Sequence, residues 1–201
     1  MKQKKYFGML EKAVLFGLVF SVLISLTNFD NNCTNLKSNI LRLHILANSD
    51  SAFDQETKLK VRDEILKKSG NLFENTNSLE SAKKTANDNI EEFVKTANSV
   101  LKNNGYKASA RLGKSFFETR KYDDFTLPAG VYDSLIITLG EGKGHNWWCV
   151  IYPSVCLGSS AEKLSKSVNK KSSYVAEHPK KYKIRFKTVE IYEKVKKKMQ
   201  G

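Results

Sequence analysis

Polar and hydrophobic residues alternate along residues 40–46, ILRLHIL. Arg42 and His44 lie on one face of this segment, and the other face carries Leu41, Leu43 and Ile45. A period of two with one apolar face is typical of a half-buried strand. We therefore expect a strand here, followed by a turn in the polar cluster ANSDS.

Three later segments share the strand pattern. The period of two returns at residues 106–112, and runs rich in β-branched and aromatic residues cover 131–140 and 146–153. Five residues, EGKGH, join these last two runs, which predicts a C-terminal β-hairpin.

Two segments have helical spacing instead. Ser51 followed three residues later by Asp54 predicts a helix start, and the pattern continues to Lys68 before Gly70 ends it. A longer apolar stripe predicts one continuous helix over residues 82–101. The stripe consists of Ala82, Ala86, Ile90, Phe93, Val94, Ala97 and Leu101.

Together these patterns predict the fold class α/β (α+β), as a small single domain with a mixed or antiparallel sheet, two main helices and the hairpin. The lysine-rich end gives weaker signals. Residues 160–175 fit a weak helix or a mobile segment. Residues 182–199 fit a strand at Tyr182 to Phe186 that continues into a basic amphipathic helix.

The N-terminus differs from the rest of the chain. A basic start is followed by an uncharged apolar run over residues 13–26, which has the length of a signal-peptide core. We expect residues 1–28 to be a signal peptide or a signal anchor, and the protein to be exported. Residues 29–157 would then form the domain, and 158–201 a basic C-terminal extension.

Charge is concentrated in that extension. The chain has a net charge of +13, and residues 159–201 hold thirteen Lys and Arg against four Glu. A field of this sign favours anionic lipid headgroups, anionic wall polymers or an acidic partner. A solvated charged face is the alternative, and export argues against nucleic acid as a partner.

Export also changes the interpretation of the cysteines. Outside the cytosol Cys149 and Cys156 are a candidate disulfide, with Cys33 left over. The alternative is that both are small buried hydrophobic residues.

The sequence carries no specific enzyme, cofactor or metal motif. Glu141, His145 and Cys149 follow one another at intervals of four residues, so their side chains could point the same way on an extended segment. They could then act as the carboxylate, base and nucleophile of a cysteine hydrolase, but such groups normally come from distant segments. A zinc site from His44, His145 and the two later cysteines lacks the clustered spacing that makes such a site specific. The glycines around Lys143 do not match a phosphate loop.

Two adjacent tryptophans, Trp147 and Trp148, must point to opposite faces of any strand that contains them. One therefore faces the core. The other either forms a contact surface for a partner or lies under a second covered face.

Two long blocks, residues 41–66 and 129–156, resemble the stage II sporulation protein R family of endospore-forming bacteria. The resemblance covers about residues 35–157. It implies a forespore protein that is exported to the space between the two membranes and activates a membrane-embedded aspartic protease. In the mother cell that protease processes pro-sigma-E, and the family implies no catalysis by the protein itself.

The resemblance and the tryptophans suggest a partner-binding region without a catalytic residue. Its expected members are His44, Asn48, Ser49, Asp50, Asn146, Trp147 and Trp148. Two other functions remain open: an exported cysteine hydrolase, and a protein that binds polyanions or membranes through its basic tail.

Overall fold

The computed structural model describes residues 2–73, 76–153 and 161–200. Its centre is a four-stranded mixed sheet in the order β2-β5-β1-β6. The strands are β1 (Leu41–Leu46), β2 (Ala108–Phe117), β5 (Gly130–Leu139) and β6 (Asn146–Tyr152). β1 runs parallel to β5 and antiparallel to β6, while β2 and β5 are antiparallel. The predicted fold class, a small single domain with a mixed sheet, is confirmed.

The predicted hairpin between residues 131–140 and 146–153 is wrong in its pairing. β5 and β6 form at nearly the expected positions, but β1 lies between them and hydrogen-bonds to both. Their connection must therefore cross the width of one strand, about 10 Å in all. Local turn signals cannot reveal a strand inserted from about 90 residues earlier in the chain.

Both faces of β1 are covered, so the expected half-buried strand is also wrong. Leu43 and Ile45 belong to a core that includes Val61, Ile65 and Phe93 of the helical layer. On the other face, Arg42 is fully buried, with its guanidinium carbon 4.1 Å from the Phe117 ring centroid. That face carries a second cluster, to which the N-terminal helix α1 (Lys2–Lys37) and the C-terminal helices contribute.

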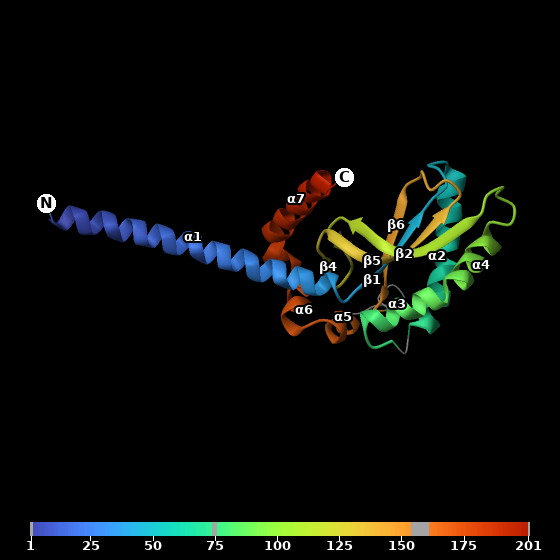
Figure 1. Cartoon of the computed structure of the whole chain (residues 1–201), viewed down its shortest axis with the longest axis horizontal. Coiled ribbons are helices and arrows are strands. Elements are labelled where there is room, and N and C mark those ends of the chain that lie inside the picture. Colours follow the sequence, from blue (N-terminus) through green and yellow to red (C-terminus); the bar gives the residue numbers. More distant parts are fainter. Residues whose placement is uncertain (1, 74–75, 154–160, 201) are drawn as a thin grey trace.

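Three helices cover the first face of the sheet (Figure 1): α2 (Ala52–Leu72), α3 (Leu79–Asp88) and α4 (Ile90–Val100). The predicted start of α2 is confirmed, because Ser51 Oγ accepts a hydrogen bond from the Asp54 amide at 3.1 Å. The helix continues past Gly70. The single helix expected over 82–101 is broken at Asn89, whose side-chain amide donates to the Thr85 carbonyl, a local bond that competes with regular helix.

The other elements are two short strands and the helices of the chain ends. β3 (Arg120–Lys121) and β4 (Thr126–Leu127) form a separate two-stranded sheet. The C-terminal elements are α5 (Ala161–Ser167), α6 (Lys170–Glu177), the 3-10 turn η1 (Pro179–Tyr182) and α7 (Lys183–Gln200).

The strand expected at Tyr182 to Phe186 is wrong, because Tyr182 ends the turn η1 and the helix α7 begins at Lys183. Phe186, Val189 and Glu193 recur at helical spacing and are buried. This longer pattern prevails over the three-residue alternation of Tyr182, Ile184 and Phe186.

Helix α1 (Lys2–Lys37) joins the body only through its C-terminal part (Figure 1). Phe29, Cys33 and Leu36 are buried, and the first two share a cluster with Val175 and Phe186. The rest of the helix extends away from the sheet. None of the helices in the described ranges is both long and apolar enough to cross a membrane.

Candidate functional site

Two segments far apart in the sequence meet at the C-terminal end of β1. The turn at residues 47–50 follows this strand, and the loop at residues 140–145 passes over it on the way from β5 to β6. The Gly144 amide donates to the Ala47 carbonyl at 2.9 Å, and the Lys143 amide donates to the Asn48 carbonyl at 3.1 Å. The inserted position of β1 thus brings the two loops together.

Side chains of the turn fix the loop further. Asn48 Oδ1 accepts the Glu141 amide at 2.9 Å. Asp50 Oδ1 accepts the His145 amide at 2.6 Å and lies 2.5 Å from His145 Nδ1. The hydrogen bonds from His145 lower the pKa of the Asp50 carboxyl below its ordinary value. Asn48 and Asp50, two of the expected site residues, therefore hold the loop in place.

A buried carboxylate lies beneath the turn. Asp54 Oδ2 accepts hydrogen bonds from Ser49 Oγ at 2.6 Å and Asn48 Nδ2 at 2.9 Å. Its other oxygen accepts the Tyr106 hydroxyl at 2.5 Å. Bonds from Ser49 and Tyr106 are the main cause of the lowered Asp54 pKa. The sequence placed Asp54 in a helix cap and in the first block of the family resemblance, but no local pattern connects it to Tyr106.

Lys58, one turn further along α2, was also missed. It is buried, and its ammonium donates to the His145 carbonyl at 2.9 Å and to Gln55 Oε1 at 2.5 Å. Gln55 in turn donates to the Ser49 carbonyl at 2.9 Å. Burial lowers the Lys58 pKa. The start of α2 is thus a rigid base on which both loops rest.

The other expected site residues do not all join this cluster. Asn146 follows the loop directly and is exposed. Trp147 faces the helical layer, where its ring centroid lies 5.3 Å from the Arg62 guanidinium carbon. Trp148 lies on the opposite face with His44 and Phe117, at ring-centroid distances of 6.3 and 5.6 Å. Of the two interpretations of the paired tryptophans, the structure has the one in which the second tryptophan, Trp148, lies on a covered face.

His44 makes the stability of this second face depend on pH. Its Nδ1 lies 3.2 Å from Ser115 Oγ, and burial lowers the pKa of the imidazole despite a side-chain hydrogen bond with Asn146, which acts in the opposite direction. The unfolded chain therefore binds a proton at higher pH than the folded chain, so stability falls as pH drops below about 6.5. In urea titrations from pH 8 to 5, we expect His44→Phe to reduce this loss. An unchanged pH dependence would contradict this assignment.

The candidate nucleophile, base and carboxylate do not form one group. Glu141 pairs with Lys143 at 2.6 Å, and His145 pairs with Asp50. Cys149 is buried in β6 and disulfide-bonded. Its expected partner Cys156 lies outside the described residues, so that pairing stays a prediction. Among the residues with described positions, no three His, Cys, Asp or Glu side chains are grouped to hold a metal ion.

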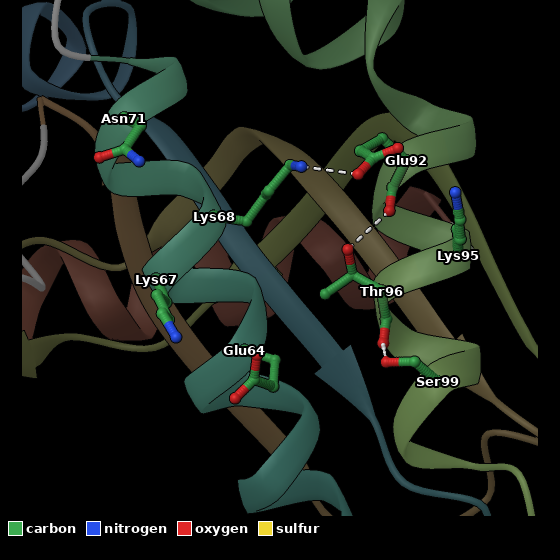
Figure 2. A pocket seen from close by; sticks show the side chains of 8 residues that line it. All are labelled: Glu64, Lys67, Lys68, Asn71, Glu92, Lys95, Thr96 and Ser99. Carbon is green, nitrogen blue, oxygen red and sulfur yellow. Dashed lines mark hydrogen bonds and ion pairs between the residues drawn. The ribbon is translucent and has the colours of Figure 1, made fainter.

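A polar groove lies between α2 and α4 (Figure 2), and its ion pair is of an ordinary surface kind. Lys68 Nζ lies 2.6 Å from Glu92 Oε1, and both side chains are about 40% exposed. This contact lowers the Glu92 pKa, whereas a general base requires a raised one. The groove is lined by Glu64, Lys67, Lys68, Asn71, Glu92, Lys95, Thr96 and Ser99.

An exposed aromatic side chain follows the turn at residues 47–50 closely in the sequence. Phe53, in the first turn of α2, is 61% exposed. Asp50, three residues before Phe53, has 57% of its side chain exposed, and its partner His145 has 81% exposed. An exposed aromatic residue on a rigid polar surface is typical of a protein contact. Sequence reasoning did not single out Phe53.

The fold and this cluster define a small mixed α/β domain that presents a rigid loop surface. The chain belongs to the stage II sporulation protein R family, whose model matches residues 37–163. It is 32% identical over 148 residues to stage II sporulation protein R of Bacillus subtilis strain 168. The match covers 72% of this chain and 66% of that relative, just under two thirds of its length. No solved structure matches the chain.

Proposed function

We propose that this protein is an exported sporulation signal that activates a membrane-embedded aspartic protease, which processes pro-sigma-E in the mother cell. Family membership supports a role in sporulation. The apolar run at residues 13–26 supports export. The loop cluster supports activation by binding, because its polar groups hydrogen-bond to one another and hold the surface of the two loops in place.

The observation that carries the proposal is the bonding between the turn at 47–50 and the loop at 140–145. Four backbone amides of the loop donate hydrogen bonds to the turn, across more than 90 residues of sequence, and Glu141, Asn146 and the nearby Phe53 are exposed. A preformed surface loses little conformational entropy on binding. We propose that this surface contacts the protease.

The proposal is tested by reconstitution. The full chain would be added to membranes that carry the protease and its pro-sigma substrate, with cleavage followed over time. We expect cleavage to depend on the added protein. Phe53→Ser should raise the concentration for half-maximal cleavage at least about tenfold, as expected for loss of one aromatic anchor.

Leu59→Ser is the matched control. Leu59 is a partly exposed apolar residue of the same helix, but it lies nearly two turns after Phe53 and about 120° around the helix from it. Its variant should activate as the wild type does. Equal activation by both variants would show that contact is made elsewhere, and no cleavage with correctly folded protein would overturn direct activation.

A further inference from the structure

Helix α7 has two apolar faces, and only one is used in the fold. Phe186 and Val189 pack in the cluster with α1. The second face is open to solvent, with apolar side chains that are 51% to 82% exposed. It consists of Ile184, Ile191, Tyr192, Val195 and Met199.

Helical geometry groups these exposed residues. At 100° per residue they fall within an arc of about 100°, which is the width of an apolar stripe on an amphipathic helix. Phe186 and Val189 lie outside that arc. A helix that needed only its contact with α1 would have polar residues along most of the stripe, whereas Thr188 is the one polar residue of α7 within this arc.

Basic side chains border the stripe on both sides. α7 has seven Lys and Arg and two Glu. By helical geometry, Lys187 and Lys198 lie along one border of the stripe and Lys196 along the other. Glu193 is buried and pairs with Lys37 at 2.8 Å. Glu190 lies outside the stripe and pairs with Lys194 at 3.0 Å and with Lys187 at 3.2 Å. Apart from Thr188, the stripe is therefore apolar, and the charged side chains along its borders are basic.

The apolar part of α1 leaves the body beside this helix (Figure 1). Arg185 Nη2 donates to Ser25 Oγ at 2.6 Å, which joins the two helices where α1 emerges. Immediately before this contact, Phe20 and Ile24 of α1 are exposed. Exposed apolar side chains of α1 thus begin next to α7.

We propose that the open face of α7 lies on an anionic lipid surface, with its apolar stripe among the acyl chains and its lysines at the phosphates. An apolar stripe bordered by Lys and Arg is the pattern of helices that lie in the membrane interface. A second copy on the same face would bring like charges together. The proposal does not depend on the protease.

The experiment measures the depth of a nitroxide on the full chain. The label is placed at position 195 by Val195→Cys, and in a control protein by Lys102→Cys, an exposed site after α4. Each protein is bound to vesicles of phosphatidylcholine with phosphatidylglycerol. We expect position 195 to become more accessible to oxygen than to a nickel chelate, while position 102 stays accessible to the chelate.

This readout separates α7 from any insertion of α1, because it reports position 195 itself. Adding Lys187→Glu and Lys198→Glu should return the label toward water, as should high salt, which screens the lysines. A label that stays in water on vesicle-bound protein, or protein that does not bind, would overturn the proposal. Spin coupling between copies without vesicles would instead assign the face to a second copy.

Discussion

Asp54→Ala is expected to lower the free energy of unfolding by about 3 kcal/mol, because hydrogen bonds to a buried charged acceptor each contribute about 1.5–3 kcal/mol and some of the donors regain water. Asp54 accepts from Ser49, Asn48 and Tyr106, so its loss releases both the turn and the segment that leads into β2. Urea denaturation at pH 7 measures the change. Tyr106→Phe removes one of these bonds and should cost about 1 kcal/mol.

The pH dependence has a definite sign. The Asp54 pKa is lowered in the folded protein, so its contribution is present above the unfolded-state pKa near 4 and is lost as pH falls through the folded value. The difference between wild type and Asp54→Asn should therefore shrink below about pH 4. A difference that stays constant down to pH 2 would show that the carboxylate charge contributes nothing.

Gly144→Ala is expected to lower the free energy of unfolding by about 2 kcal/mol and to impair protease activation. A Cβ at this position would lie 2.1 Å from the Ser49 carbonyl oxygen, so the loop must move away from the turn. Two backbone hydrogen bonds, from Gly144 and Lys143, would be lost, at about 1 kcal/mol each. Urea denaturation and the cleavage assay measure the two effects.

Gly105→Ala is the control for this substitution. Gly105 has a φ of 74° and open space around it, so alanine there costs about 1 kcal/mol of backbone strain without a clash. Its variant should lose stability but activate the protease normally. If Gly144→Ala activates as well as Gly105→Ala does, then the joined loops do not form the contact surface.

Local patterns predicted those elements whose signals are local. Ser51 and Asp54 fixed the start of α2, and the alternation around Leu43 located β1. The pairing of β5 with β6 was mispredicted because strand order depends on contacts that no local pattern contains. The strand predicted at Tyr182 to Phe186 in the basic tail was wrong, because the buried face of α7 is specified by its contacts with α1, about 160 residues earlier.

The candidate site shows the same division. The family resemblance pointed to Asn48, Asp50 and Asn146, which the structure places on or beside the joined loops. Nothing in the sequence connected Asp54 with Tyr106, 52 residues later, or gave Lys58 a carbonyl partner at His145. These contacts follow from the path of the chain in space.

The central position of β1 also sets the order in which the protein can fold. β1 lies early in the sequence, but it cannot pair until β5 and β6, which end at residues 139 and 152, have been synthesised. Pairings at such long sequence separation give a high contact order and slow folding. A chain that is still being synthesised therefore has no joined loops, and the surface that we propose for protease contact forms only after nearly the whole domain is available.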